Sequence, residues 1–356
     1  MSLTRSRRPQ SSFGEPVGPA PAPASREAVS PERRRVVAAL GAAGLLGASG
    51  GVLAQAAALP YPNRAVRFVV PFPPGSGTDT TARMFAKKIG EFTGQPVSVE
   101  NRPGGNGFIG VQAALNPPND GYTVFIGSNS TLSTNAATFK KLPYDPLTDI
   151  TPISLLSRGP CLIIVPPKSP FQTLADLIAE ARKRPGALNY ATGSMSYTLY
   201  SEWLNDLAGM KTTGITYKGA GDAVNVTMAG TVDFAVVDAS GANELVRGGR
   251  LRALAYTSRE RSSVLPEVPS IVEAGVPDFL AENWVAAAVT SKAPAGVAER
   301  LAALFVQAGA DPETKEFYRR QGSQLIVSPP AELRRYQEQE IARWSRLVKL
   351  TGIELQ

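Results

Sequence analysis

The segment Val66-Arg-Phe-Val-Val70, followed by Pro71-Phe-Pro-Pro-Gly-Ser-Gly-Thr-Asp79, gives the clearest indication of the fold of this chain. A short run of β-branched and aromatic residues predicts a buried strand, and a helical pattern over residues 78–92 follows it after a glycine turn. The same order returns along the chain, where short apolar runs alternate with helical stretches. This alternation predicts an α/β fold built on a parallel sheet.

Beyond this unit, the pattern predicts two successive strand–helix series and a late return of the chain. Further strands are predicted at residues 97–100, 123–126, 161–165, 188–191, 215–217, 234–237, 251–256 and 284–289. Helices are predicted from residue 108, over 173–182, near 199–207, 223–228 and 243–247, from Asp311-Pro312-Glu313, and from Ser328-Pro329. We therefore expect two lobes with a ligand cleft between them: residues 57–158 plus 289–356 as lobe 1, and 159–288 as lobe 2.

Composition removes several classes of enzyme. The 356 residues are 43% hydrophobic and 19% charged, which is typical of a folded globular protein, but they include no histidine and one cysteine, Cys161. This excludes Ser-His-Asp and Cys-His catalysis, His-ligated metals and intrachain disulfides. Cys161 lies in an apolar run without flanking cations, so we expect a buried free thiol.

The positive charge is concentrated at one end of the chain. The formal net charge is +7, but residues 1–56 hold seven arginines and three glutamates and so account for +4 of it. The remaining 300 residues carry 30 basic and 27 acidic groups. This near-balance gives no basic footprint, and we expect no nucleic-acid partner.

Residues 1–56 read as an export leader that is removed. Arg33-Arg34-Arg35 precedes the apolar run 36–54, and cleavage fits after Ala54 or Ala56. The alternative is a membrane anchor, although the run is dominated by Ala and Gly. The order Arg33-Arg-Arg-Val-Val37 also resembles a twin-arginine signal, so the Sec and twin-arginine routes both stay open. The predicted location is the periplasm.

Four predicted strands end in turns that combine glycine with Ser, Thr or Asn, a fifth ends in the glycine turn of residues 217–222, and a sixth ends at Asp238. Glycine lets backbone approach a ligand, and helix N-termini expose N–H donors with partial positive charge. Such turns can bind an anion without a cationic side chain. The alternative is ordinary strand-to-helix loop chemistry, with Ser and Thr as helix caps.

Two nucleotide motifs fail in detail. Residues 74–79 resemble a phosphate loop, but no Lys-Ser/Thr follows. Gly105-Asn-Gly-Phe-Ile-Gly110 matches G-x-G-x-x-G, yet the next strand ends without the acidic residue that a ribose requires. We predict no cofactor, no metal and no catalytic residue. A nucleotide-dependent oxidoreductase and an α/β enzyme acting on a small acid through Asp79, Asp238 or Lys218 are the alternatives.

The chain also resembles the Bug family, the periplasmic substrate-binding proteins of tripartite tricarboxylate transporters. The matching segments are Val69-Val-Pro-Phe-Pro-Pro-Gly75 with Asp79, Val99-Glu-Asn-Arg-Pro-Gly-Gly-Asn-Gly-Phe-Ile-Gly110, Tyr217-Lys-Gly-Ala220, Leu251-Arg-Ala-Leu-Ala-Tyr-Thr-Ser-Arg259 and Leu265-Pro-Glu-Val-Pro-Ser-Ile-Val-Glu-Ala-Gly275. The resemblance implies a type II, Venus-flytrap binding protein without catalysis. It further implies a small carboxylated ligand and, as partners, the permease subunits of such a transporter or a sensor. We expect a monomer.

The strand ends and the resemblance point to the same candidate ligand-binding residues. They are Phe72, Gly75, Ser76, Gly77, Thr78, Asp79, Gly104, Gly105, Asn106, Gly107, Ser128, Asn129, Ser130, Thr192, Gly193, Ser194, Ser196, Tyr217, Gly219 and Asp238. The chain departs from the family at Gly75-Ser-Gly77, where a Gly-Gly pair is common, and at Thr198-Leu199, where His-Leu is common. The identity of the carboxylate is left open.

Overall fold

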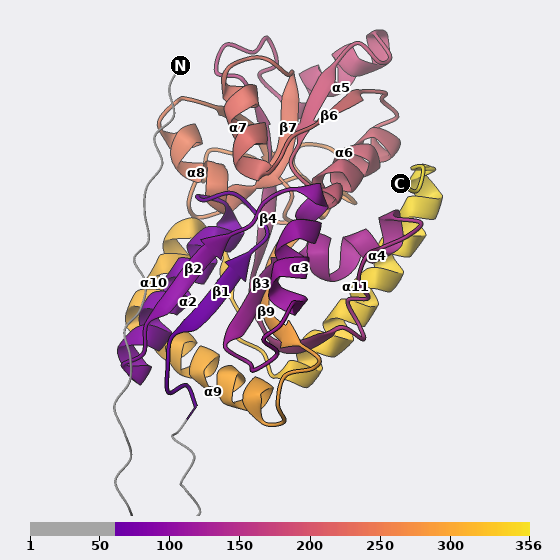
Figure 1. The fold of residues 1–356 in the computed structure, drawn as a ribbon. Coiled ribbons are helices and arrows are strands. Elements are labelled where there is room, and N and C mark those ends of the chain that lie inside the picture. The colour runs from indigo at the N-terminus through magenta and orange to yellow at the C-terminus, as the bar shows by residue number, and fades with distance from the viewer. Residues whose placement is uncertain (1–60) are drawn as a thin grey trace, which may run out of the picture. The chain divides into compact units, whose positions relative to one another are not determined.

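The computed structural model describes residues 61–356, so the predicted leader, its cleavage sites and its export route lie outside the described residues. Within them, strands and helices alternate as predicted (Figure 1). The strands are β1 (Val66–Val70), β2 (Val97–Asn101), β3 (Thr123–Ser128), β4 (Ile150–Val165), β5 (Asn189–Thr192), β6 (Thr213–Thr216), β7 (Phe234–Asp238), β8 (Arg252–Tyr256), β9 (Glu282–Thr290) and β10 (Gln324–Leu325).

The helices cover both faces of these strands. They are α2 (Gly77–Thr93), α3 (Phe108–Leu115), α4 (Asn135–Thr138), α5 (Leu174–Lys183), α6 (Met195–Leu207), α7 (Ala220–Met228), α8 (Ala239–Arg247), α9 (Val297–Ala310), α10 (Pro312–Gln321) and α11 (Pro330–Thr351). A 3₁₀ turn, Gly105–Gly107, precedes α3, and a π-helical turn, Ser130–Thr134, follows β3. No helix in residues 61–356 has the length and apolar character needed to cross a bilayer.

Strand β4 joins two sheets because it changes partners along its length. From Ile150 to Pro160 it pairs antiparallel with β9, and from Cys161 onward it pairs with β7 and β8. The first sheet contains β2, β1, β3, β9, β10 and the early part of β4. The second sheet contains the end of β4 with β8, β7, β5 and β6.

The prediction of a parallel sheet is only partly right, because the two sheets are mixed. Strands β1, β2 and β3 are parallel to one another, as are β5, β6 and β7. Strands β4 and β9 run antiparallel to their neighbours. The antiparallel strands arise where the chain passes from one sheet to the other and returns, so each connects two otherwise parallel units.

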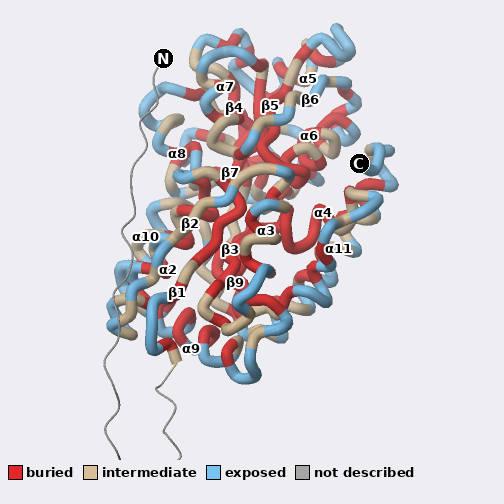
Figure 2. The backbone as a smooth tube through the Cα atoms, in the orientation of Figure 1, coloured by how far each residue is buried: buried red, intermediate tan, exposed pale blue. Residues whose placement is uncertain are grey.

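Side chains alternate between the two faces of each sheet, as the period of a strand requires. In β1, Val66 and Phe68 pack with helices α2 and α9, whereas Val69 packs with α3 on the opposite face. In β4, Ile163 faces α5 and α6, whereas Leu162 faces α7 and α8. Each sheet therefore has its own pair of apolar cores, and these make the buried interior of Figure 2.

Helix α11 packs against both halves of the molecule. Leu333, near its start, belongs to a core beneath the first sheet, and Trp344 and Leu347 belong to the core of the second sheet that contains α5 and α6. Trp344 is fully buried. The helix thus ties the two sheets together along one side.

The predicted lobe boundaries at 158/159 and 288/289 remain our proposal. Strand β4 passes from the first sheet to the second between Pro160 and Cys161, close to the first boundary. Strand β9 pairs with strands of the first sheet from Glu282 onward, which favours placing the second boundary near residue 282. Each lobe is then one sheet with helices on both of its faces.

Candidate functional site

The turns that follow strands of both sheets meet around a narrow inner cavity of about 20 Å³. Its lining comes from the first sheet through the turn after β1 and the end of β3, and from the second sheet through the turns after β5, β6 and β7. The lining residues are Phe72, Ser76, Gly77, Thr78, Ser128, Gly193, Ser194, Tyr197, Ala220, Asp238 and Asn283. The cavity therefore lies between the two lobes and is lined by both.

A wider outer cavity of about 640 Å³ adjoins the inner one, because Phe72 and Gly193 line both. Its lining residues are Phe72, Gly104, Gly105, Asn106, Gly107, Gly193, Thr216, Tyr217, Lys218 and Asp222. The outer cavity carries one cationic and one anionic side chain, Lys218 and Asp222. Together the two cavities form a cleft that narrows inward.

Four helix N-termini converge on the inner cavity. Gly77 opens α2, Ser194 is the N-cap of α6, Ala220 opens α7, and Asp238 is the N-cap of α8. Each helix start presents N–H groups without an intrahelical partner and a partial positive charge. The convergence directs N–H donors and partial positive charge at the inner cavity without a cationic side chain, and the Asp238 carboxylate lines the same cavity.

Two of these four helix starts have no side-chain cap. Ser76 accepts a hydrogen bond from Asp79 N at the start of α2, and Asp238 accepts one from Gly241 N at the start of α8. By contrast, Ser194 and Gly219, the N-caps of α6 and α7, supply no side-chain hydrogen bond. The first-turn N–H groups of α6 and α7 are thus the ones best placed to bind an acceptor.

Two glycines allow the turns to approach closely. A Cβ atom on Gly193 would collide with the backbone of Gly219 and Ala220, so the turns after β5 and β6 touch only because residue 193 has no side chain. A Cβ atom on Gly219 would lie 2.5 Å from Pro73 Cδ, which belongs to the other lobe. Gly219 is therefore a contact point between the lobes.

Other contacts also join the lobes at the cleft. The hydroxyls of Thr134 and Ser196 are 2.8 Å apart, and Asn129 Nδ2 donates to the Tyr200 hydroxyl at 3.1 Å. The Tyr200 hydroxyl in turn donates to the Glu282 carbonyl. These polar contacts hold the two lobes together over the inner cavity.

The structure places thirteen of the twenty candidate residues on a cavity wall. They are Phe72, Ser76, Gly77, Thr78, Gly104, Gly105, Asn106, Gly107, Ser128, Gly193, Ser194, Tyr217 and Asp238. The other seven line neither cavity: Gly75, Asp79, Asn129, Ser130, Thr192, Ser196 and Gly219. Their contacts hold the turns and the lobes in place.

Asp79 illustrates this supporting role. Its carboxylate accepts from Gly75 N at 2.9 Å, from Arg83 Nε at 3.0 Å and from Asn101 Nδ2 at 2.8 Å. Burial acts to raise the pKa of Asp79, but the Arg83 guanidinium and the two other donors outweigh it, so the pKa lies below its ordinary value. Asp79 therefore holds the turn after β1 in place, although the sequence analysis listed it among the ligand-binding candidates.

The turn after β5 is held by threonines. The Thr192 hydroxyl donates to the Ser194 carbonyl at 2.9 Å and lies 3.0 Å from the Thr198 hydroxyl. Thr198, which stands where the family often has histidine, therefore supplies a hydrogen-bonding group to this turn.

Six wall residues are absent from the candidate set: Tyr197, Thr216, Lys218, Ala220, Asp222 and Asn283. Most of them neighbour a predicted turn, and wider limits around the turns would have included them. Asn283 is different because it lies inside β9, an antiparallel strand that passes beneath the cavity. Only the pairing of β9 with β3 and β4 reveals its position.

Cys161 is a fully buried free thiol, as predicted. Burial raises its pKa well above the ordinary value, and nearby Asp238 and Glu282 act in the same direction. The thiol is therefore held in its neutral, unreactive form.

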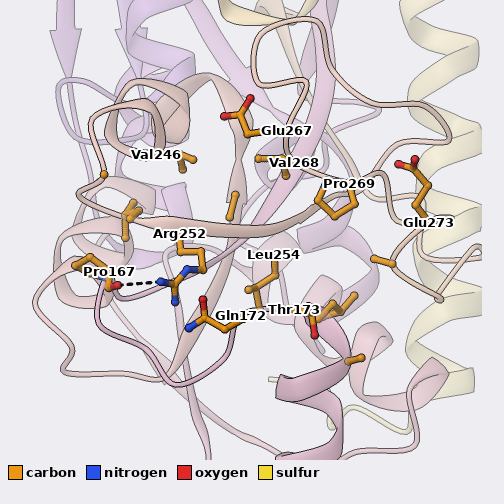
Figure 3. Close-up of a pocket in the computed structure, with 16 residues that line it drawn as sticks. Pro167, Gln172, Thr173, Val246, Arg252, Leu254, Glu267, Val268, Pro269 and Glu273 are labelled. Carbon is orange, nitrogen blue, oxygen red and sulfur yellow. Dashed lines mark hydrogen bonds between the residues drawn. The ribbon is translucent and has the colours of Figure 1, made fainter.

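A second large hollow lies elsewhere, along the edge strand β8 of the second sheet (Figure 3). This edge groove, of about 680 Å³, is lined by Pro167, Gln172, Thr173, Leu174, Ala175, Val246, Gly249, Leu251, Arg252, Ala253, Leu254, Glu267, Val268, Pro269, Glu273 and Ala274. None of the twenty candidate residues lines it.

Comparison with known proteins gives a consistent set of likenesses. The family model described as tripartite tricarboxylate transporter family receptor matches residues 81–353. The protein BugT of Bordetella pertussis is 34% identical over 320 residues, covering 88% of this chain and 97% of BugT. A solved R. palustris protein with adipate is 31% identical with a TM-score of 0.79, covering 83% of this chain and 99% of that one. MatC from Rhodopseudomonas palustris, with bound malate, is 28% identical with a TM-score of 0.77, covering 81% of this chain and 100% of MatC.

Proposed function

The chain belongs to the tripartite tricarboxylate transporter receptor family, and we propose that it binds a small carboxylated metabolite in the cleft between its two lobes. It is a solute receptor and not an enzyme, and it has the two-lobe α/β fold of a periplasmic binding protein. The relatives solved with adipate and with malate support the acid class of the ligand.

The convergence of four helix N-termini on one cavity carries this proposal. A carboxylate placed against the uncapped starts of α6 and α7 accepts N–H bonds from both helices. The hydroxyls of Thr78, Ser128 and Ser194 line the same wall and supply further hydrogen bonds. In the outer cavity, Lys218 can pair with a second carboxylate of a longer ligand.

Binding is coupled to lobe closure because the ligand's partners come from both sheets. In an open form, a carboxylate at α6 and α7 would lack the wall formed by Phe72, Ser76 and Ser128. A ligand that gains contacts only in the closed form shifts the population towards it. A membrane partner would then recognise the closed form.

For the partner we propose the permease of a tripartite transporter, with a sensor as the alternative. For the location we propose the periplasm, reached through the leader of residues 1–56 by the Sec or the twin-arginine route. N-terminal sequencing of the exported protein tests the predicted cleavage after Ala54 or Ala56.

Thermal-shift screening of the purified protein tests the proposed function. The panel contains mono- and dicarboxylates, aromatic acids and amino acids, and calorimetry then measures the dissociation constant of each stabilising acid. An acid at about 100 times its dissociation constant is expected to raise the unfolding midpoint by roughly 5 °C or more. A folded protein that no acid stabilises would contradict the proposal.

A further inference from the structure

Asp238 places a negative charge in a cavity that otherwise attracts anions. Among the residues that line the inner cavity, it alone has an ionisable carboxyl or a basic side chain. It is 7% exposed, and its hydrogen-bond partners within residues 61–356 are neutral groups. A buried carboxylate whose partners are neutral depends on hydrogen bonds to offset the loss of water around it.

The two carboxylate oxygens of Asp238 are not equally satisfied. Oδ1 accepts from the Ser240 hydroxyl and, at 3.1 Å, from Gly241 N, so it forms the cap of α8. Oδ2 has the Tyr197 hydroxyl as its one donor in the described chain, at 3.5 Å. A hydroxyl–oxygen hydrogen bond has an optimum near 2.7–2.8 Å, so this contact is weak. Oδ2 therefore has unused capacity to accept.

The position of Asp238 restricts what a ligand can place beside it. A Cβ atom on Gly77 would lie 3.0 Å from Oδ1 and 3.2 Å from Oδ2, so the carboxylate is packed against the start of α2. A ligand carboxylate beside Oδ2 would meet a like charge in a site with little water. A ligand hydroxyl or ammonium there would instead donate to Oδ2.

We infer that this receptor selects acids that also carry a hydrogen-bond donor, a hydroxyl or an ammonium group, and that Oδ2 of Asp238 is the acceptor that reads this donor. The inference rests on the proposed function and narrows its ligand class. The ligand carboxylate lies at the uncapped starts of α6 and α7, and the donor lies at the start of α2. Asp238 is thus a specificity-determining residue at the inner end of the cleft.

Matched acids that differ in one group test this inference. Calorimetry on the purified protein compares succinate with malate and aspartate, glutarate with 2-hydroxyglutarate and glutamate, and adipate with 2-aminoadipate. In the chain length that fits, the hydroxy or amino acid is expected to bind about 10-fold to 100-fold tighter than the plain diacid. Comparison of the hydroxy acid with the amino acid of the same chain length shows which donor is preferred.

Asp238→Asn is the diagnostic variant, because asparagine keeps the size of the side chain and can still cap α8. It is expected to reduce the preference to about threefold or less, and to bind the plain diacid no more weakly because the like charge is gone. Asp278→Asn, at an exposed position that lines neither cavity, is the matched control and should keep the preference.

Tyr197→Phe provides a second test, which can be used if Asp238→Asn does not fold. It removes the weak competing donor to Oδ2 while keeping the ring, and should preserve or increase the preference for donor-bearing acids. Equal affinity for a plain diacid and its donor-bearing counterparts would overturn the inference while leaving the proposed function intact. A preference that survives in folded Asp238→Asn would also overturn it. If no acid binds at all, the proposed function fails and this inference fails with it.

Discussion

The cleft and the edge groove are of similar size, but their polar groups are used in opposite ways. The edge groove measures about 680 Å³ and the outer cavity of the cleft about 640 Å³, so volume does not separate them. The difference lies in hydrogen bonding: Thr173, Arg252 and Glu273 along the groove are hydrogen-bonded within the protein, whereas the starts of α6 and α7 in the cleft have no side-chain cap.

At the start of helix α5, the polar groups beside the groove form hydrogen bonds within the protein. At its start the Thr173 hydroxyl accepts from Asp176 N, and the Asp176 carboxylate accepts from Thr173 N, which forms a complete capping box. The Arg252 guanidinium, which Figure 3 shows turned towards Pro167, donates to the carbonyls of Pro167, Ser169 and Phe171.

Helices α6 and α7 present the contrary case in the cleft. Their N-caps, Ser194 and Gly219, make no side-chain hydrogen bond to the helix, so donors remain for a ligand. A binding site is marked here by unsatisfied donors that converge, whereas a hollow whose donors and acceptors are already paired offers a ligand little.

Gly219→Ala should prevent closure of the cleft and is expected to cause the largest loss of ligand affinity. Its backbone is extended, with φ −173°, so alanine is tolerated locally, but the new Cβ would lie 2.5 Å from Pro73 Cδ on the opposite lobe. We expect affinity for the best acid to fall by about 10-fold to 100-fold, because the clash exists only in the closed form. Calorimetry measures this loss, and the unfolding midpoint without ligand should barely move.

Gly221→Ala is the matched control two residues along the same helix. A Cβ atom there meets no other atom within 4 Å, and alanine favours the helix. Its affinity should equal that of the unchanged protein. If Gly219→Ala binds equally well, the lobes do not need this approach and the proposed closure is wrong.

A second pair of variants compares the two kinds of helix start directly. Thr173→Ala removes the cap of α5 and should lower the free energy of unfolding by about 1 kcal/mol, with ligand affinity unchanged. Ser194→Ala removes a cavity hydroxyl that caps nothing, so it should weaken binding about 10-fold with little effect on stability.

Urea unfolding measures the free energy of unfolding of both variants, and calorimetry measures their ligand affinity. If Ser194→Ala destabilises the ligand-free protein as much as Thr173→Ala and leaves binding intact, Ser194 is a structural cap. The distinction between cleft and groove would then fail at α6.

The alternating strands and the turns of the cleft could be predicted from the sequence because they depend on local patterns. Helices α6, α7 and α8 were nevertheless predicted to start near residues 199, 223 and 243, but they begin at Met195, Ala220 and Ala239. The first turns of α7 and α8 consist of small and polar residues, and that of α6 contains Ser196 and Thr198, so the apolar periodicity that reveals a helix begins one turn late.

Strand β4 shows a different limit. Only residues 161–165 were predicted, because Pro152, Gly159 and Pro160 interrupt the earlier stretch, yet the strand extends back to Ile150. Pairing with β9 holds this part in the sheet, and such a long-range partner leaves no mark in a local window. The same pairing places Asn283 in the cavity wall, which explains why the sequence did not predict it.

Low pH is expected to weaken the capping box of α5 and so to lower the stability of the protein slightly. Hydrogen bonds from the backbone N–H and hydroxyl of Thr173 and from Gln172 N hold the pKa of Asp176 below its ordinary value of 3.8. The depressed pKa means that this contribution to stability is complete above pH 3.8 and is lost as the pH falls through the lower, folded-state value. The urea midpoint should therefore fall less steeply between pH 5 and pH 3 in Asp176→Asn than in the unchanged protein.

The exposed Asp278→Asn, as control, should keep the steeper dependence of the urea midpoint on pH. Ligand affinity at pH 7 should be equal in all three proteins, because the paired groups of the groove take no part in the cleft. A change in affinity in Asp176→Asn would show that groove and cleft are coupled, and that the contrast between them is incomplete.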